Sequence, residues 1–357
     1  MEGLKGLILS GGAGTRLRPI THTSAKQLVP VANKPVLFYG IEALVAAGVE
    51  EIVIVIAPET GGEIRAAAGD GSAFGARITY VEQDAPRGLA HAVLTAEDAL
   101  GGGSFVMYLG DNLLRDGITD LVTTFRGGGK DALILLTQVP DPWHYGVAEL
   151  DGERIVRLVE KPEEPPSNMA LVGVYLFGSA IFDAARAIEP SGRGELEITD
   201  AIQHLIDSGL SVESRTVTGW WKDTGQLADM LEANRLVLED LEQSVEGDLV
   251  ESKIEGRVHV AAGARIERSL IRGPAIVGAG AVIRDSYIGP YTSIDEGVTI
   301  ERSEVEHSIL LSGCTVSDLE SRMEASLLGR NVKLTRGVGV PRTLSMIVGD
   351  RSEITLP

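Results

Sequence analysis

Short aliphatic runs alternate with longer amphipathic stretches along the first two thirds of the chain. Six runs rich in Val, Ile and Leu predict strands at residues 4–10, 51–57, 78–82, 104–109, 132–138 and 172–177. Three stretches place apolar residues at helical spacing, at residues 35–47, 89–100 and 198–208. Because strands alternate with helices, this region predicts a mostly parallel sheet with helices on both faces.

A repeat replaces the helical pattern after residue 250. Aliphatic residues recur 17 positions apart in three columns: Ile254, Ile271, Ile288 and Val305; Val260, Val277, Ile294 and Leu311; Ile266, Ile283 and Ile300. Stacked coils of a triangular prism require such columns. The pattern resembles the hexapeptide-repeat left-handed β-helix over residues 250–335. An ordinary β-sandwich would need alternating strands and would not keep this register.

The length of 357 residues suggests two domains, since a domain typically holds about 150 residues. We expect an α/β protein with a mostly parallel, Rossmann-like sheet domain over residues 1–240. A left-handed parallel β-helix is expected over residues 241–357. The charged stretch at residues 239–251 is expected to be either the hinge region between the domains or the end of a helix.

Charge and cysteine content exclude several classes of protein. The chain has 32 basic and 51 acidic residues, and a net charge of −19 argues against a nucleic-acid partner. Cys314 is the only cysteine, so an intrachain disulfide and a cysteine zinc cluster are excluded. No apolar run is long enough to cross a membrane, and we expect no membrane partner and a reduced, cytosolic location.

The strand at residues 4–10 runs into a glycine-rich loop, Gly11-Gly12-Ala13-Gly14-Thr15-Arg16. Glycines let backbone N–H groups approach phosphate oxygens, so the loop is expected to hold a nucleotide. No Gly-Lys-Ser/Thr follows, and Leu17 stands where a dinucleotide-binding fingerprint needs its third glycine. A tight turn with a surface arginine is the alternative interpretation of this loop.

Three separated motifs carry a resemblance to a known family: GGAGTRLRP at residues 11–19, KQLVPV at 26–31 and KP at 34–35. The chain resembles the sugar-1-phosphate nucleotidylyltransferases, and within them the long-form glucose-1-phosphate thymidylyltransferases, which carry an added β-helix. The resemblance implies that Arg16 and Lys26 are the catalytic basic pair around the triphosphate. It also implies nucleotide-binding roles for residues of the loop and its surroundings, namely Leu9, Gly11, Gly12, Gly14, Thr15 and Gln27.

Base recognition is expected in the stretch after the third predicted strand. A side-chain amide can donate and accept hydrogen bonds at the edge of a pyrimidine base, and a glycine lets the base approach the backbone. The resemblance assigns this pair to Gln83 and Gly88, with Pro86 between them. We expect His91 to be a residue of the helix face rather than a ligand.

Two aspartates are expected to bind Mg²⁺. Asp111 follows an apolar strand, and Mg²⁺ prefers one or two carboxylates together with substrate phosphates. Asp111 is therefore expected to contact the nucleotide as well. The resemblance supplies Asp223, in a W-x-D-T-G segment, as the second ligand. Either aspartate could instead be an ordinary turn or cap residue.

The resemblance implies a separate site for the sugar phosphate. In it Glu160 accepts hydrogen bonds from sugar hydroxyls, Lys161 neutralises the phosphate, and Gly146 allows close backbone approach. The alternatives for Glu195 and Glu197 are a sugar contact or a helix cap. Trp143-His144 departs from the charged pair expected in many relatives. The predicted sugar-phosphate residues are Tyr145, Gly146, Glu160, Lys161, Val172, Gly173, Glu197 and Trp220.

The implied reaction joins dTTP and glucose 1-phosphate into dTDP-glucose with release of pyrophosphate, in a homo-oligomer. Uridylyl transfer to a glucose or N-acetylhexosamine 1-phosphate is an alternative. An acetyltransferase activity of the β-helix is another, although His259 and His307, the only histidines of the repeat, lie in no recognised catalytic pattern. The third alternative is a binding module that senses sugar nucleotides and catalyses no reaction.

Overall fold

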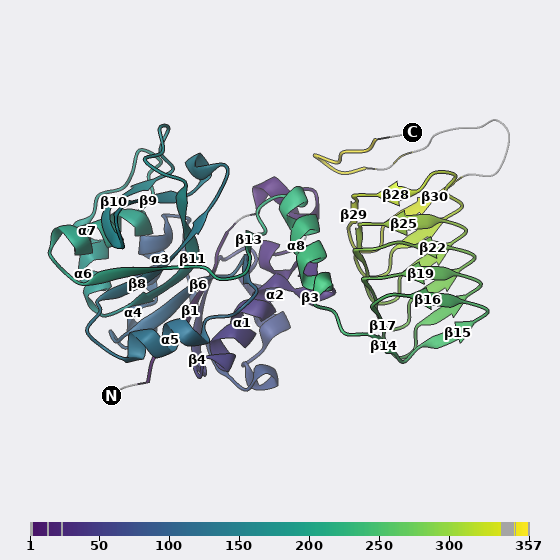
Figure 1. Cartoon of the computed structure of the whole chain (residues 1–357), viewed down its shortest axis with the longest axis horizontal. Coiled ribbons are helices and arrows are strands. Elements are labelled where there is room, and N and C mark those ends of the chain that lie inside the picture. The colour runs from purple at the N-terminus through teal and green to yellow at the C-terminus, as the bar shows by residue number, and fades with distance from the viewer. Residues whose placement is uncertain (1–2, 13, 23, 337–345, 347, 356–357) are drawn as a thin grey trace. The chain divides into compact units, whose positions relative to one another are not determined.

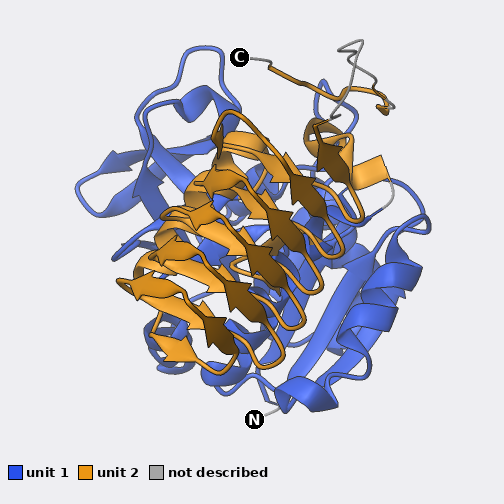
Figure 2. Cartoon of the chain, turned by 90° about the vertical axis from the view of Figure 1, so that its right-hand side faces the viewer, with its two compact units in different colours: residues 1–13, 24–28, 36–223 blue, residues 14–23, 29–35, 224–357 orange. Residues whose placement is uncertain are grey.

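The computed structural model describes residues 3–12, 14–22, 24–336, 346 and 348–355. They form two compact units, which are described separately (Figure 2). Unit 1 comprises residues 1–13, 24–28 and 36–223, and unit 2 comprises residues 14–23, 29–35 and 224–357. The domain boundary between residues 240 and 241 stays a prediction. Part of the predicted 241–357 domain, at residues 337–345, 347 and 356–357, lies outside the described residues.

The main sheet of unit 1 has the strand order β10-β9-β11-β6-β1-β4-β5, and β8 joins it to β12 (Figure 1). Strands β1, β4, β5 and β6 are mutually parallel, whereas β11 runs antiparallel to β6, β8 and β9. The bounds are β1 (Lys5–Ser10), β4 (Glu51–Ile56), β5 (Arg77–Glu82), β6 (Phe105–Leu109), β8 (Ala132–Gln138), β9 (Gly146–Asp151), β10 (Arg154–Glu160), β11 (Met169–Phe177) and β12 (Val212–Thr216).

All six predicted strands are present, and the predicted fold class is confirmed. Five of them match to within one residue at each end, and β11 begins three residues earlier than predicted. The missed strands β9, β10 and β12 are amphipathic or half-exposed, so they lack the continuous aliphatic run of a strand buried on both faces.

Helices cover both faces of the sheet because successive residues of a strand point to opposite sides. Leu7 and Leu9 of β1 pack in one apolar cluster, and Ile8 packs in another. The first cluster includes α3 (Leu89–Thr95), α4 (Glu97–Leu100), α6 (Ala180–Ala187) and α7 (Ile198–Asp207). The second includes α1 (Val36–Ala46), α2 (Gly61–Ala68) and α5 (Thr119–Arg126). The predicted helix at residues 89–100 is interrupted at Ala96.

Unit 2 contains three sheets of short parallel strands, which fit the predicted left-handed β-helix (Figure 1). The first sheet is β14 (Ser244–Val245), β17 (Val258–Val260), β20 (Ala275–Val277), β23 (Thr292–Ile294), β26 (Ile309–Leu310) and β29 (Leu327–Leu328). The second is β15 (Asp248–Val250), β18 (Arg265–Glu267), β21 (Val282–Arg284), β24 (Thr299–Glu301), β27 (Thr315–Ser317) and β30 (Lys333–Thr335). The third is β16 (Lys253–Glu255), β19 (Leu270–Arg272), β22 (Tyr287–Ile288), β25 (Glu304–Glu306) and β28 (Met323–Glu324).

The stacked columns of the repeat are present, with one correction. Ile266, Ile283 and Ile300 pair in register and are fully buried. Ile294, however, pairs with Leu310 and not with the predicted Leu311. Both leucines are buried, so apolar spacing could not distinguish them, and the backbone register decides. One coil is therefore a residue shorter than the period.

Unit 2 also contains helix α8 (Leu227–Glu239) and a hairpin of β2 (Pro30–Val31) and β3 (Lys34–Pro35). The charged stretch at residues 239–251 thus begins at the end of a helix. A further two-stranded sheet, β7 (Asn112–Leu114) with β13 (Trp221–Asp223), belongs to unit 1. In the described part of the chain, no helix combines the length and the apolar character that a membrane span requires.

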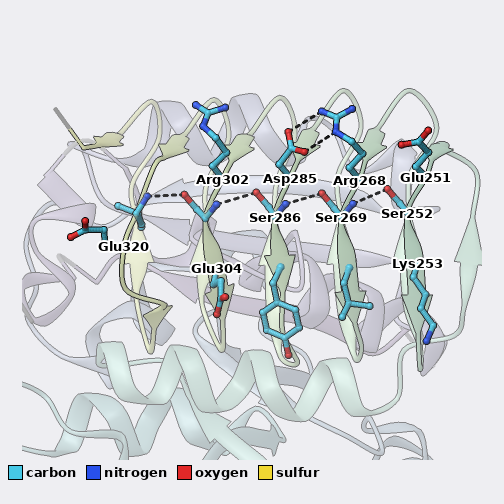
Figure 3. Close-up of a pocket in the computed structure, with 14 residues that line it drawn as sticks. Glu251, Ser252, Lys253, Arg268, Ser269, Asp285, Ser286, Arg302, Glu304 and Glu320 are labelled. Carbon is cyan, nitrogen blue, oxygen red and sulfur yellow. Dashed lines mark hydrogen bonds and ion pairs between the residues drawn. The ribbon is translucent and has the colours of Figure 1, made fainter. Parts of the chain in front are cut away.

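Serines at one corner of successive coils form a ladder (Figure 3). Each hydroxyl accepts a hydrogen bond from a backbone N–H one coil further on, at 3.0 to 3.2 Å, in Ser252, Ser269, Ser286 and Ser303. The same hydroxyls donate to a carbonyl two residues earlier in the chain. Ion pairs flank the ladder, and Arg268 donates to both carboxylate oxygens of Asp285 at 2.7 and 2.8 Å.

We predict that Ser286→Ala destabilises the β-helix. The change removes the partner of the Ser303 N–H and of the Arg284 carbonyl inside the ladder, and an unsatisfied buried polar group costs about 1–3 kcal/mol. Chemical denaturation followed by circular dichroism measures the loss. Ser252→Ala is the matched control because Ser252 is half-buried and water can replace its hydroxyl. An equal loss for both variants would contradict the prediction.

Candidate active site

A cavity of about 240 Å³ lies in unit 1, beyond the carboxyl ends of the parallel strands. The hydrogen bonds between neighbouring strands continue just beyond the strand ends and position the loops that line the cavity. Gln83 N–H donates to the Ile56 carbonyl and Gly110 N–H to the Leu9 carbonyl, each at 2.9 Å. A larger groove of about 760 Å³ follows the serine ladder of the β-helix (Figure 3). Charged side chains of that groove are already held in ion pairs: Arg268 with Asp285 inside the groove, and Arg302 and Glu304 with Asp318 and Arg322 outside it. We therefore place the candidate site in unit 1.

Eight of the ten predicted nucleotide-binding residues line the smaller cavity, namely Leu9, Gly11, Gly12, Gln27, Gln83, Pro86, Gly88 and Asp111. Val55, Leu89, Ala92 and Leu109 line it too, although no sequence motif pointed to them. Glu195, expected at a sugar hydroxyl or as a helix cap, also lines it. The other two, Gly14 and Thr15, belong to unit 2 together with Arg16, and their place in the site stays a prediction.

The amide of Gln83 is held by two neighbours. Gln83 is 8% exposed, and its Nε2 donates to the Gly88 carbonyl at 3.3 Å and lies 2.9 Å from Nδ1 of His91. His91 was expected to be an ordinary helix residue, but the structure places it against the predicted base-recognition side chain. Because Nε2 is committed to these contacts, Oε1 is the atom of the amide that is left to accept from a ligand.

Gly88 stands where a side chain cannot fit. Its φ is +100°, and a Cβ would lie 2.3 Å from the Leu196 carbonyl oxygen. The backbone of this loop is joined to the segment before α7, since Ala90 N–H donates to Leu196 O and Leu196 N–H to Arg87 O. The glycine therefore fixes the cavity wall through close backbone packing.

Gln27 shows that the cavity is suited to a polar ligand. The residue is 2% exposed and lines the cavity, yet its Oε1 has no hydrogen-bond partner among the described residues. Most buried polar atoms in folded proteins are hydrogen-bonded, and an exception requires an explanation such as a ligand. A donor group of a bound nucleotide would satisfy this atom.

A buried ammonium group is the centre of the site. Lys26 is 7% exposed, and its Nζ contacts Oδ2 of Asp111 and lies 3.7 Å from Oδ1 of Asp223. The three residues come from separate segments of the chain, and the fold brings both aspartates to one ammonium. Their predicted binding of a shared metal ion stays a prediction. A cation between two carboxylates is compensated in charge and held in position.

The β7–β13 pair explains how Asp223 reaches Asp111. Asp223 pairs with Asn112 in the antiparallel register, which places it beside the residue that follows Asp111. Asn112 was missed by sequence analysis. Its Nδ2 donates to Asp111 at 2.9 Å, while its Oδ1 accepts from Trp221 Nε1 at 2.6 Å and from Gly173 N–H at 3.2 Å.

Lys26 controls the ionisation of Asp111. Burial raises the pKa of the Asp111 carboxyl, but the charge and hydrogen bond of Lys26, with the amide of Asn112, outweigh it and hold the pKa below its usual value. Asp111 is therefore a carboxylate at neutral pH.

The two aspartates also fit a divalent metal. In the part of the chain that the structure describes, no three His, Cys, Asp or Glu side chains form a metal-binding group. Two carboxylates that converge on one cation do meet the needs of a hard ion that takes its other ligands from phosphates and water.

A second polar cluster gathers five of the eight predicted sugar-phosphate residues: Tyr145, Gly146, Glu160, Lys161 and Glu197. Gly146 pairs with Glu160 across β9 and β10, and Lys161 N–H donates to the Tyr145 carbonyl at 3.0 Å. Glu160 accepts from Thr199 Oγ1 at 2.7 Å. A Cβ on Gly146 would lie 2.7 Å from that hydroxyl, so this approach requires glycine.

Arg193 links the carboxylates of this cluster, and sequence analysis missed it. Its guanidinium donates to Glu197 at 2.8 Å and to Glu160 at 3.2 Å. Partial burial opposes its charge, but the hydrogen bond with Glu197 and the neighbouring carboxylates raise the pKa of Arg193 above its usual value. The sequence did offer one signal for Arg193: it is the single basic residue between two glycines, directly before the acidic segment at residues 195–199.

Glu197 occupies the N-cap position of α7, but its side chain does not cap the helix. It accepts from Ser191 Oγ at 2.7 Å as well as from Arg193. Burial and the charges of Glu197 and Glu160 raise the pKa of Asp200. The cluster thus combines several acidic groups, which suits donors such as sugar hydroxyls.

For the remaining predicted residues, Val172, Gly173 and Trp220, contact with the sugar phosphate stays a prediction. Val172 is fully buried in the core, and Gly173 lies in an irregular part of the β11–β8 pairing, where a Cβ would be 2.6 Å from Asn112 Oδ1. The Trp220 carbonyl accepts from Arg115 N–H at 3.1 Å. The aromatic contact with Tyr145 comes from Trp221, with ring centroids 5.5 Å apart.

Comparisons with known proteins agree with this geometry. A family model described as nucleotidyl transferase matches residues 5–240. The chain is 56% identical to a glucose-1-phosphate thymidylyltransferase of Streptomyces antibioticus, over 99% of both chains. It is 53% identical to one of Streptomyces griseus, over 98% of both. A Bacillus anthracis crystal structure, described as a glucose-1-phosphate thymidylyltransferase in complex with sucrose, has a TM-score of 0.64 and 36% identity over 68% of this chain and 98% of that one.

These findings confirm the resemblance that the sequence motifs carried. The family model spans the sheet domain, and the two Streptomyces relatives extend the match through the β-helix. The chain therefore belongs to the nucleotidyl transferase family, within its group of glucose-1-phosphate thymidylyltransferases.

Proposed function

We propose that the protein transfers the thymidylyl group of dTTP to glucose 1-phosphate, forming dTDP-glucose and pyrophosphate. The observation that carries this proposal is the buried Lys26 between Asp111 and Asp223, beside a cavity lined by Gln83 and Gly88. The activity of the Streptomyces relatives, as their names state it, supports the same substrates.

The reaction exchanges one phosphoanhydride bond for another. A phosphate oxygen of glucose 1-phosphate attacks the α-phosphorus of dTTP, and the bond from that phosphorus to the bridging oxygen of the β-phosphate breaks. Pyrophosphate leaves with the bonding electron pair. The attacking phosphate is already ionised at neutral pH, so the protein needs no general base.

Positive charge must offset the repulsion between the two anionic substrates, and it must lie where charge develops. Lys26 is suited to the α-phosphate because two carboxylates hold its ammonium in position. Arg16 is proposed to bind the triphosphate, and Lys161 the phosphate of the sugar. An ammonium fixed as that of Lys26 is needs no rearrangement during the reaction.

Nucleotidyltransferases of this family generally use a divalent metal ion. We propose that it is Mg²⁺ and that Asp111 and Asp223 hold it. When bound, the ion would neutralise phosphate charge. The low pKa of Asp111 keeps this carboxylate ready to bind a cation at neutral pH.

Gln83 is proposed to recognise the base. Its Nε2 is engaged with Gly88 and His91, so Oε1 would accept from the N3–H group of thymine. Uracil offers the same group, and only the space around the thymine methyl separates the two, a difference worth about 1–3 kcal/mol. We expect dTTP to be preferred and UTP to be accepted.

The acidic cluster is proposed to bind the hexose. Glu160 and Glu197 are oriented by Arg193, Ser191 and Thr199, and they offer acceptors for sugar hydroxyls.

A cytosolic location and a homo-oligomeric state belong to the proposed function as well. Measurement of the molecular mass in solution tests the oligomeric state.

The test of the proposed function is a substrate panel. Four nucleoside triphosphates are combined with glucose, galactose and N-acetylglucosamine 1-phosphate in the presence of Mg²⁺, and pyrophosphate release is followed. We expect the highest kcat/KM with dTTP and glucose 1-phosphate, and UTP second. Release only with UTP, or none with any pair, would overturn the proposal.

Lys26→Ala is predicted to lower kcat by about 100-fold or more, because a fixed charge stabiliser in the transition state is lost. Pyrophosphate release at saturating substrates measures kcat, and circular dichroism verifies the fold. Lys130→Ala is the control, since Lys130 is also a mostly buried lysine in an ion pair, with Glu213. A folded Lys26→Ala enzyme with near-normal kcat would show that the assignment is wrong.

Gln83→Leu is predicted to lower kcat/KM for dTTP by about 10- to 100-fold, corresponding to about 1–3 kcal/mol for a lost buried hydrogen bond. The side chain keeps its size, so the cavity wall should remain. KM for glucose 1-phosphate, measured in the same assay, is the internal control and should stay unchanged. A parallel loss for both substrates would point to a misfolded site instead.

A further inference from the structure

The two chain segments that flank Lys26 belong to the β-helix unit. Residues 14–23 and 29–35 group with residues 224–357, whereas residues 24–28, with Lys26 and Gln27, group with the sheet. In sequence, Lys26 is therefore bounded on both sides by segments that pack in unit 2. Contacts that hold residues 14–23 and 29–35 in place therefore also restrict the conformations open to residues 24–28.

Asn234 of α8 connects three parts of unit 2. It is fully buried, and its Oδ1 accepts from Ala32 N–H at 2.9 Å and from Ser293 Oγ at 2.6 Å. Its Nδ2 donates to the Tyr291 carbonyl at 3.0 Å. One side chain thus ties the β2–β3 hairpin and helix α8 to a single coil of the β-helix.

The tip of that hairpin has a backbone that needs support. Ala32 and Asn33 have φ values of +47° and +60°, the left-handed pair of a two-residue hairpin turn. Alanine is rare in this region, and such a conformation persists only when its surroundings hold it. The bond from Ala32 N–H to Asn234 does so, and Asn33 Nδ2 adds a bond to the Ile294 carbonyl at 2.7 Å.

The segment before Lys26 is also in contact with the C-terminal part of unit 2. Arg351 Nη1 donates to the Thr15 carbonyl at 3.3 Å, and Ile20 lies against Gly329, whose Cβ position is 3.3 Å from Ile20 Cδ1. Both flanks of the Lys26 segment are therefore held within the same unit, and Asn234 is the fully buried polar link on the downstream side.

We propose that Asn234 is a positioning residue through which the β-helix holds the hairpin that follows Lys26 and Gln27. The inference rests on the proposed function, and it makes the β-helix a part of nucleotidyl transfer rather than a passive tail. Ala32 lies six positions after Lys26, so a hairpin that leaves its turn conformation shifts the end of the lysine segment. Transfer between two anions is sensitive to such shifts, because misplacement by about 1 Å can cost 100-fold in rate.

Asn234→Ala tests the proposal at a temperature well below its unfolding midpoint. We expect kcat to fall about 10-fold or more with KM values for dTTP and glucose 1-phosphate nearly unchanged, since alignment and not ground-state binding is lost. Hydrogen exchange of the peptide over residues 24–36 should rise. This second readout does not depend on activity.

Arg235→Met is the matched control on the same helix. Arg235 stacks over the Tyr291 ring and pairs with Glu232, so its loss weakens the packing of α8 on the β-helix without removing a bond to the hairpin. Its kcat and its exchange over residues 24–36 should remain close to wild type. If Arg235→Met lowered kcat as much as Asn234→Ala, the proposal would fail.

Ala32→Gly provides a rescue. Glycine adopts a positive φ without strain, so the turn no longer depends on Asn234. Added to Asn234→Ala, it should restore part of the lost kcat and lower the exchange of residues 24–36. A double variant as slow and as mobile as Asn234→Ala would count against the hairpin as the route.

Asn33→Gly takes the place of Asn234→Ala if the latter does not fold. It keeps the left-handed turn but removes the bond to Ile294, and a loss of kcat with raised exchange is expected. The inference is overturned if the folded test variant, Asn234→Ala or its substitute Asn33→Gly, has the kcat of the wild type and the same hydrogen exchange over residues 24–36. If the wild-type enzyme releases no pyrophosphate, the proposed function has failed, while the exchange measurements still decide whether Asn234 holds the hairpin.

Discussion

The candidate site depends on one interaction, the buried ammonium of Lys26 between the carboxylates of Asp111 and Asp223. A buried ammonium alone would be costly, and the two carboxylates compensate it, with one negative charge left over for a further cation. The cluster fixes a cation beside the cavity, keeps Asp111 ionised, and joins segments that are far apart in the chain. A phosphate transfer that uses no general base needs little else than such fixed charges and correct alignment.

Around this cluster the site is built from backbone as much as from side chains. Gly88, Gly146 and Gly173 each stand where a Cβ would collide with a neighbouring group. These close approaches bring chain segments from different parts of unit 1 into direct contact. They also explain why polar side chains such as Gln83 and Asn112 can be buried with fixed partners.

The β-helix solves a different physical problem. Its aliphatic columns fill the interior, while the serine ladder satisfies the backbone at one corner of each coil. Asn234 uses one coil of it to hold the β2–β3 hairpin. That hold is the basis of our proposal that the β-helix restrains the chain segment next to Lys26.

The sequence by itself determined the architecture, because apolar periodicity distinguishes strands, helices and coils, and it also indicated Lys26, Asp111, Asp223 and the nucleotide loop through their motifs. It did not reveal Arg193, Asn112, the contact of His91 with Gln83, or the register that pairs Ile294 with Leu310. These depend on which side chains meet across segments distant in the chain. Only the tertiary structure decides that, since hydrogen bonds between such segments leave no periodic trace in the order of residues.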